Sequence, residues 1–176
     1  MDCKKKKHHY IQGKSVWVYK GDMKTSIYRF KYANRREYAK FHAEESARIY
    51  GKWIQSKGID VIIPIPIHSK KMKKRGYNQA ELYARELGRL LDIPVDRDSL
   101  VRIVDTVPQK ELDDKQRRKN LKKAFKIKSD SVQWKRVLIV DDVYTTGSTI
   151  DAAAALFGEY GVQEIYFLSI TIGEGY

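Results

Sequence analysis

One segment, residues 137–150, constrains the fold more than any other part of the chain. Its sequence, VLIVDDVYTTGSTI, begins with four apolar residues, continues through Asp141 and Asp142, and enters a stretch rich in Thr, Gly and Ser. The apolar run predicts a fully buried strand, and the apolar spacing from Ile150 to Phe157 predicts a helix after the loop. A strand, loop and helix in this order indicate an α/β fold, in which ligands bind at the carboxyl edge of a parallel sheet.

The loop in this segment has the composition of a phosphate-binding cradle. Backbone N–H groups at a helix N-terminus attract a phosphate monoester, hydroxyl side chains add donors, and glycine permits a close approach of the backbone. The two acids lie where a bound 5-phosphosugar would place its vicinal hydroxyls, and a carboxylate accepts two such hydrogen bonds. The candidate phosphate-binding residues are Thr145, Thr146, Gly147, Ser148 and Thr149, and the candidate sugar-binding residues are Asp141 and Asp142.

A less specific interpretation of the same segment is an ordinary strand-to-helix turn capped by Ser or Thr. That turn accounts for any two of the loop residues, but not for two acids followed by Thr-Thr-Gly-Ser-Thr after a buried strand. A Walker loop is excluded, because the segment has no Gly-Lys-Ser/Thr.

The rest of the chain predicts one α/β domain with a mostly parallel central sheet flanked by helices. Strands are predicted at residues 61–63, 100–104, 124–127 and 164–172, and a helix at residues 78–91. Residues 1–14 are expected to form a basic tail, residues 15–57 a small N-terminal hood and residues 58–176 the core. Within the hood, a short strand is expected at residues 16–19.

Two helices are also predicted in the hood. Asp22 is expected to cap the first of them. The second helix, residues 36–54, is expected to turn four large side chains toward a core; these are Tyr38, Phe41, Ile49 and Trp53.

The charge of the chain favours a polyanionic ligand. The net charge is +13 from 35 basic and 22 acidic residues, but residues 137–176 hold six of the acids and no Lys or Arg. Residues 1–136 therefore carry +19. Solubility explains much of this charge, while nucleic acid, phosphates and pyrophosphate remain open as partners.

The apolar and cysteine content points to the cytoplasm. No apolar run reaches the roughly 18 residues that a membrane span needs. The single cysteine, Cys3, excludes an internal disulfide framework and fits a reducing compartment.

The string of residues 137–150 resembles the phosphoribosyl-pyrophosphate (PRPP) motif of type I phosphoribosyltransferases. The resemblance implies a type I phosphoribosyltransferase fold with PRPP as substrate and Mg²⁺ as cofactor. By the same resemblance, Asp141 and Asp142 hold the ribose 2- and 3-hydroxyls and bind Mg²⁺ directly or through water, and residues 145–149 hold the 5-phosphate.

Two further runs resemble the ComF family of competence-associated phosphoribosyltransferase-like proteins. They are IIPIPIHSKKMKKRGYNQAELYARELGRLL, residues 62–91, and VPQKELDDKQRRKNLKKAF, residues 107–125. The most specific points are the Arg-Gly-Tyr-Asn-Gln string at residues 75–79 and the spacing of Gln109, Arg117 and Asn120.

The ComF resemblance implies further site residues. It places the pyrophosphate loop at the turn of residues 64–68, where one peptide bond is expected to be cis, and a substrate-covering element at residues 109–123. Arg75 and Arg117 are expected to bind pyrophosphate, because a guanidinium fork matches phosphate oxygens. The complete set added by this resemblance is Pro66, Ile67, His68, Arg75, Asn78, Gln79 and, as a catalytic residue, Arg117.

One feature departs from the family pattern. Family members often begin with a four-cysteine zinc module whose last cysteine would align with Cys3, but the other three cysteines are absent here. We therefore expect no zinc site.

The leading hypothesis is Mg²⁺-dependent phosphoribosyl transfer, in which an acceptor that the sequence does not identify displaces pyrophosphate from C1 of the ribose. Its expected role lies in competence and DNA uptake or in nucleotide metabolism. The alternatives are a non-catalytic PRPP or nucleotide sensor, an accessory protein that binds single-stranded DNA, and a scaffold for competence proteins. The basic runs contain few aromatic residues on which bases could stack, which favours a small phosphorylated ligand over DNA.

Overall fold

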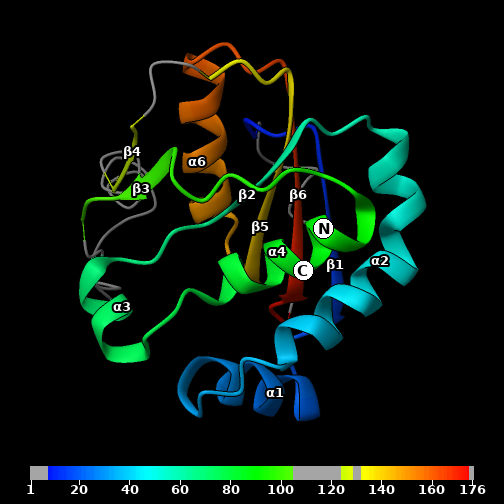
Figure 1. The fold of residues 1–176 in the computed structure, drawn as a ribbon, viewed down its shortest axis with the longest axis vertical. Helices are drawn as coiled ribbons and strands as arrows, with labels where there is room; N and C mark the ends of the chain where they lie inside the picture. Colours follow the sequence, from blue (N-terminus) through cyan, green and yellow to red (C-terminus); the bar gives the residue numbers. More distant parts are fainter. Residues whose placement is uncertain (1–7, 105–123, 129–131, 175–176) are drawn as a thin grey trace.

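The computed structural model describes residues 8–104, 124–128 and 132–174. Four parallel strands form the central sheet in the order β1-β6-β5-β2 (Figure 1). These strands are β1 (Gln12–Val18), β2 (Val61–Pro64), β5 (Arg136–Tyr144) and β6 (Glu164–Ile172). The parallel sheet flanked by helices that the sequence predicts is confirmed.

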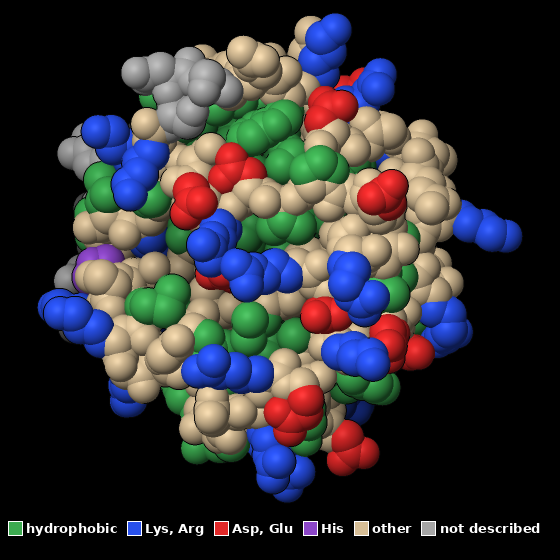
Figure 2. Space-filling model, in the orientation of Figure 1, with side chains coloured by type: hydrophobic (Ala, Val, Ile, Leu, Met, Phe, Trp, Pro, Cys, Tyr) green, Lys and Arg blue, Asp and Glu red, His purple; other side chains and the backbone are tan. Residues whose placement is uncertain are grey.

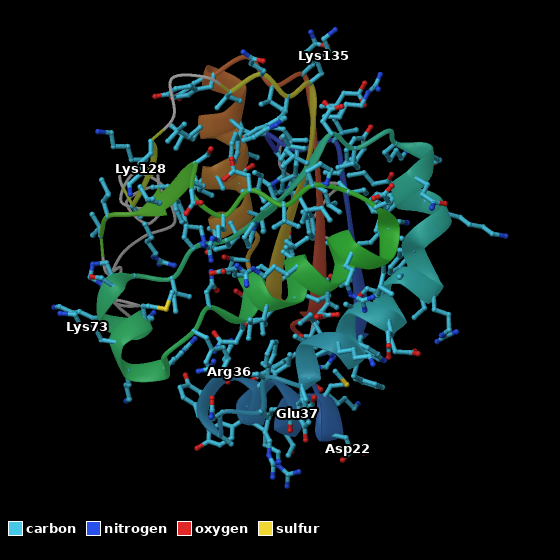
Figure 3. All side chains as sticks on the ribbon, in the orientation of Figure 1. Asp22, Arg36, Glu37, Lys73, Lys128 and Lys135 are labelled. Atoms are coloured by element: carbon cyan, nitrogen blue, oxygen red, sulfur yellow. The ribbon has the colours of Figure 1, made fainter. Side chains whose placement is uncertain are left out.

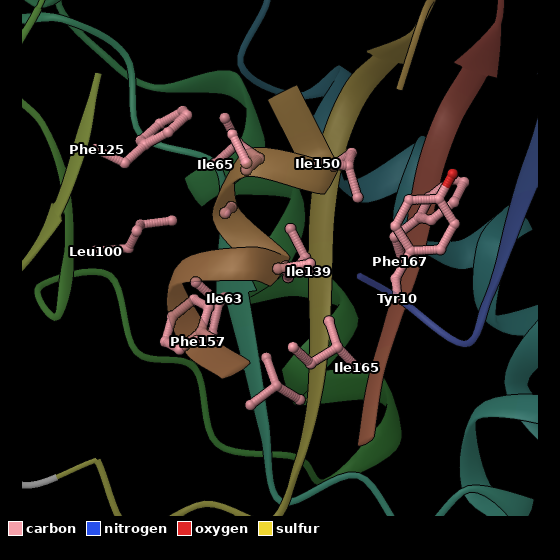
Figure 4. Close-up of a cluster of buried hydrophobic side chains, with 14 of the residues drawn as sticks. Tyr10, Ile63, Ile65, Leu100, Phe125, Ile139, Ile150, Phe157, Ile165 and Phe167 are labelled. Atoms are coloured by element: carbon pink, nitrogen blue, oxygen red, sulfur yellow. The ribbon is translucent and has the colours of Figure 1, made fainter. Parts of the chain in front are cut away.

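Helices cover both faces of this sheet, because side chains along the fully buried strands alternate between the two faces. On β5, Val137 and Ile139 belong to a buried cluster with α6 (Ser148–Glu159), which Figure 4 shows in part. Leu138 and Val140 belong to the cluster on the other face. The helices of that second face are α1 (Gly21–Tyr32), α2 (Tyr38–Ser56) and α4 (Gln79–Leu91).

A second, smaller sheet lies apart from the central one. It consists of β3 (Leu100–Arg102) and β4 (Phe125–Ile127), which pair antiparallel. Both strands are predicted by the sequence, but they do not join the parallel sheet. They are held against the α6 side of the core by Leu100, Phe125 and Ile127, which are all buried there. Figure 4 shows the first two of these side chains.

The N-terminal boundaries differ from those expected. Strand β1 begins at Gln12, inside the expected basic tail, because residues 12–18 pair with β6 along the edge of the central sheet. Tyr10 is also buried, and its ring packs edge-on against Phe167. The tail therefore ends earlier than residue 14, and the start of the expected hood belongs to the central sheet. Asp22 lies in the first turn of α1 and does not cap it, because the N-cap residue is Lys20.

The buried face of α2 also differs from the prediction. Phe41 and Ile49, expected in the core, are 52% and 42% exposed. Apart from Ile54, the buried positions are instead small or polar, and Ser46 accepts a 2.7 Å hydrogen bond from the Tyr83 hydroxyl of α4. Small residues let α2 approach α4 closely, so the larger side chains face outward.

The surface carries Lys and Arg side chains interspersed with Asp and Glu (Figure 2). In the part of the chain that the structure describes, no helix combines the length and the apolar character needed to span a bilayer.

Candidate functional site

The two acids of the motif lie within β5, near the carboxyl edge of the sheet. Strand β5 extends to Tyr144, beyond the predicted end at Val140, because it continues to pair with β6. Its pairing with β2 stops earlier, at Pro64 opposite Val140. The carboxyl ends of the strands point toward α1, which lies beyond them (Figure 1).

The loop after β5 wraps over a buried tyrosine. Gly147 has a left-handed φ of +71° and a Cβ there would collide with the Tyr144 hydroxyl. The Tyr144 ring is fixed in turn, because it stacks on Phe167 at 4.8 Å and its hydroxyl lies 3.0 Å from that of Tyr10. The sequence assigns no role to Tyr144. In the structure its fixed ring supports the backbone of the loop at Gly147.

The hydroxyl groups of this loop lie at the start of α6. Thr145 and Thr146 are exposed, and the Thr146 and Ser148 hydroxyls are 2.8 Å apart. Ser148 is the first residue of α6, and the backbone N–H of Asp151 donates to the carbonyl oxygen of Gly147. Hydroxyl groups and the N-terminus of α6 thus follow the two acids directly in the chain.

The turn after β2 is tied to the motif strand. The N–H of Ile65 donates to the carbonyl oxygen of Val140 at 2.9 Å, directly before Asp141. Pro66, Ile67 and His68 follow, and the structure leads from them into α3 (Ser69–Arg75). No peptide bond in the described ranges is cis, so the expected cis bond in this turn is wrong. The peptide bonds of this turn are trans, and the chain leaves the central sheet after Pro64, the last residue of β2.

Two residues expected to bind ligand have roles in holding this turn. His68 is the N-cap residue of α3, where its Nδ1 accepts from the N–H of Lys70. Asn78 is 6% exposed; it donates to the carbonyl oxygen of Ile65 and accepts from the N–H of Ala80 as the N-cap of α4. Asn78 and His68 therefore position the turn.

The side chains of Arg75 and Gln79 connect α3 and α4 to α1. Arg75 donates to Gln79 Oε1 and to the Tyr32 hydroxyl, both at 3.0 Å, and its guanidinium lies 4.9 Å from the Tyr32 ring centroid. Gln79 reaches the carbonyl oxygen of Phe30. Arg117 and the whole expected covering element, residues 109–123, lie outside the described residues, so their roles stay predictions.

The structure adds one residue that the sequence does not single out. Lys31 of α1 forms an ion pair with Asp142, with 3.0 Å between Nζ and Oδ2 and side chains that are only 21% and 12% exposed. Burial opposes the charge on Lys31, but Asp142 and Asp141 outweigh it and raise the pKa of Lys31. No local pattern marks this lysine among the many cations of residues 1–136.

The acidic pair is electrostatically costly without a cation. Burial and the adjacent Asp142 raise the pKa of Asp141 to about 7, while Lys31 opposes the rise. Two carboxylates suit Mg²⁺, which binds one or two protein carboxylates and completes its shell with water and substrate phosphates. Within the described ranges, no group of three or more His, Cys, Asp or Glu could hold a metal ion. The residues therefore fit a Mg²⁺ ion that arrives with a phosphorylated ligand.

The comparisons with known proteins point to one family. The sequence pattern described as "Phosphoribosyl transferase domain" matches residues 43–171. The chain is similar to "Competence protein F" of Haemophilus influenzae, with 42% identity over 60% of this chain and 47% of that protein. It is also similar to "DNA utilization protein YhgH" of Salmonella typhi, with 30% identity over 86% of this chain and 67% of that protein.

A third relative is "Competence protein ComFC" of Bacillus subtilis, with 30% identity over 85% of this chain and 59% of that protein. The chain spans about half the length of the first two curated relatives that it matches, at 47% and 46%.

Solved structures give weaker similarities. A purine phosphoribosyltransferase from Pyrococcus horikoshii has a TM-score of 0.42 and 24% identity, and the match covers 78% of this chain and 72% of that one. A hypoxanthine phosphoribosyltransferase from Staphylococcus aureus has a TM-score of 0.47 and 15% identity, with coverage of 78% and 64%.

Proposed function

Because the chain belongs to the phosphoribosyltransferase family, and within it to the ComF family of competence-associated proteins, we propose that it binds PRPP with Mg²⁺ and transfers the phosphoribosyl group. The observation that carries the proposal is the meeting of Asp141, Asp142 and the loop of residues 145–149 at the carboxyl edge of the sheet. The role of the protein would lie in competence or in the use of DNA, as the names of its relatives suggest.

Each part of the site has a proposed task. The loop of residues 145–149 would hold the 5-phosphate through N–H and hydroxyl groups, and Asp141 and Asp142 would hold the ribose hydroxyls and Mg²⁺. The turn of residues 66–68 would lie against the pyrophosphate, and Arg75 and Arg117 would approach it. When bound, Mg²⁺ would neutralise the charge that develops on the departing pyrophosphate.

In this reaction the chain mainly positions its reactants. An acceptor nucleophile bonds to C1 of the ribose while the bond from C1 to the pyrophosphate oxygen breaks, and pyrophosphate leaves with the electron pair. Holding the two reactants in line and excluding water supplies much of such a rate enhancement. No covalent intermediate with a side chain is needed.

The direct test compares the wild type with the double variant Asp141→Ala, Asp142→Ala. Calorimetry should show Mg²⁺-dependent PRPP binding for the wild type and none for the variant, with an unchanged circular dichroism spectrum. Equal affinity in both proteins would contradict the proposal. Binding without pyrophosphate release over a broad acceptor panel would identify a sensor.

A second candidate function, binding of single-stranded DNA, is favoured by one surface. Tyr28 and Tyr32 of α1 are 61% and 53% exposed, and their rings lie 5.1 Å apart. Arg75 lies over the Tyr32 ring, whereas Lys73 of α3 points outward at the left edge of the molecule (Figure 3). Exposed aromatic rings beside cations are typical of surfaces on which bases stack. The sequence alone does not show this surface, because its tyrosines and Arg75 come from different segments.

The DNA candidate is tested by substituting both tyrosines with alanine. Affinity for a short oligothymidylate, measured by fluorescence anisotropy, should fall more than tenfold, since stacking contributes about 1–3 kcal/mol per base. The single variant Tyr28→Ala, which leaves the hydrogen bond between Arg75 and Tyr32 in place, should keep PRPP binding. An unchanged oligonucleotide affinity would remove this candidate.

A further inference from the structure

The cation paired with Asp142 comes from a helix outside the motif. Helix α1 is anchored by Ile27 and Phe30, which are completely buried in the cluster that contains Val140. Lys31 follows Phe30 directly, so the anchored helix turn brings its side chain to the carboxyl edge of β5. There its ammonium lies 3.0 Å from Asp142 Oδ2.

This ion pair lies where the ligand of the proposed function would bind. Asp142 has a limited number of oxygen lone pairs, and the ammonium takes up one of its oxygens. The pair is partly open to solvent, with side chains 21% and 12% exposed, so a ligand can reach it. A lysine side chain is long and flexible, so Lys31 can leave Asp142 without any movement of α1.

The negative charges of Asp141 and Asp142 determine which ligand can replace the Lys31 ammonium. Asp141 and Asp142 are neighbours, and Asp142 is one of the causes of the unfavourable environment of Asp141. A neutral hydroxyl that displaced the ammonium alone would leave Asp142 without its ion-pair partner and would remove the larger of the two cationic contributions at Asp141. A divalent cation that arrives with the hydroxyls restores the balance.

We propose, resting on the function proposed above, that Lys31 is a resident counter-cation that a Mg²⁺–phosphoribosyl ligand displaces from Asp142. Lys31 thereby sets the Mg²⁺ concentration at which the ligand binds. It also selects against phosphorylated sugars that arrive without a divalent cation.

The first experiment measures PRPP binding against Mg²⁺ concentration at pH 8. Lys31→Met should lower the Mg²⁺ concentration for half-maximal binding by about 3- to 10-fold, the range expected for loss of a competing ion pair worth about 1 kcal/mol. Lys31→Arg, which keeps the charge, should stay close to the wild type.

A matched control separates displacement from the general electrostatic field. Arg102 also acts on Asp141 through its charge, but Lys31 is the residue that pairs with Asp142. Arg102→Gln should therefore change the Mg²⁺ requirement less than Lys31→Met. Equal shifts in the two variants would contradict displacement.

A second readout follows Lys31 itself in the wild type. Modification of its amine by an acylating reagent, quantified by mass spectrometry, should increase severalfold when Mg²⁺ and PRPP are added. In Asp142→Asn the amine should be reactive already, with or without ligand. This measurement tests the displacement of Lys31 even if the Lys31→Met variant fails to fold.

The outcomes separate the two proposals. No PRPP binding by the wild type at saturating Mg²⁺ overturns the proposed function, and this inference with it. If the wild type binds PRPP but Lys31→Met needs the same or more Mg²⁺, or Lys31 stays protected in the complex, the inference alone is overturned.

Discussion

The side-chain amide of Asn78 donates a 3.0 Å hydrogen bond to the backbone carbonyl oxygen of Ile65. Ile65 in turn donates its N–H to Val140, the residue before the acidic pair. One buried amide thus connects the start of α4, the turn after β2 and the motif strand. Its contribution to the site is to hold these three parts in register.

The first prediction concerns this amide. Asn78→Ala removes both the cap of α4 and the donor to Ile65, and should lower the free energy of unfolding by about 2 kcal/mol. Mg²⁺–PRPP affinity should fall as well, because the turn loses its support. Asn78→Asp keeps a capping oxygen but loses the donor, so denaturant melts should place it between alanine and the wild type. Equal stability of the wild type and the alanine variant would contradict this role.

The second prediction compares two glycines near α6. Gly147→Ala places a Cβ against Tyr144 at a φ of +71°, and should destabilise the protein by about 1 kcal/mol or more and weaken phosphate binding. Gly158→Ala is the matched control, since it lies in α6 with no atom within 4 Å of its added Cβ. That variant should gain up to about 1 kcal/mol. Similar effects of the two substitutions in thermal melts would show that Tyr144 does not support the loop.

The third prediction is a pH dependence set by Asp141. Because burial and Asp142 raise the pKa of Asp141 to about 7, the folded state holds this proton more tightly than the unfolded state, whose value is near 3.9. The carboxyl therefore lowers stability progressively as pH rises from about 4 to 7, and Asp141→Asn should be the more stable protein at pH 8 in denaturant melts. Mg²⁺ binding needs the carboxylate, so wild-type PRPP affinity should fall as pH is lowered through about 7. A flat profile from pH 6 to 8 would contradict the shift.

The fourth prediction concerns acid stability. His42 is fully buried, burial lowers its pKa to about 4, and its Nδ1 has no hydrogen-bond partner in the described part of the chain. The unfolded state takes up a proton near pH 6.5, so His42 contributes a fall in stability of about 1 kcal/mol for each pH unit between 6.5 and 4, opposite in sign to the contribution of Asp141. His42→Leu should flatten this slope in denaturant melts over that range. An identical slope in the two proteins would mean that other groups cause it.

The core of the site could be predicted because its signal is local. A buried strand, two acids and a hydroxyl-rich loop follow one another directly in the chain, and their order fixes their place at the sheet edge. The continuation of β5 past Val140 escaped prediction, because pairing with β6 decides where β5 ends.

Contacts between distant segments could not be predicted. Lys31 reaches Asp142 from another helix, and nothing in its neighbourhood distinguishes it from the other lysines. The prediction of the buried face of α2 was wrong for a related reason. Hydrophobicity favours Phe41 as a buried residue, whereas close packing against α4 selects small residues such as Ala43.

The pairing of β1 with β6 has a consequence for synthesis of the chain on the ribosome. In the described part of the sheet, β1 hydrogen-bonds to β6 as its neighbouring strand, from Gln12 opposite Tyr166 to Val18 opposite Ile172. Strand β1 therefore waits until β6 has been made, and the residues between them must leave the exit tunnel before the two strands can pair. Pairing at such a sequence separation slows folding. During translation, Trp17 and Val18 are thus carried on an unpaired strand that chaperones can bind.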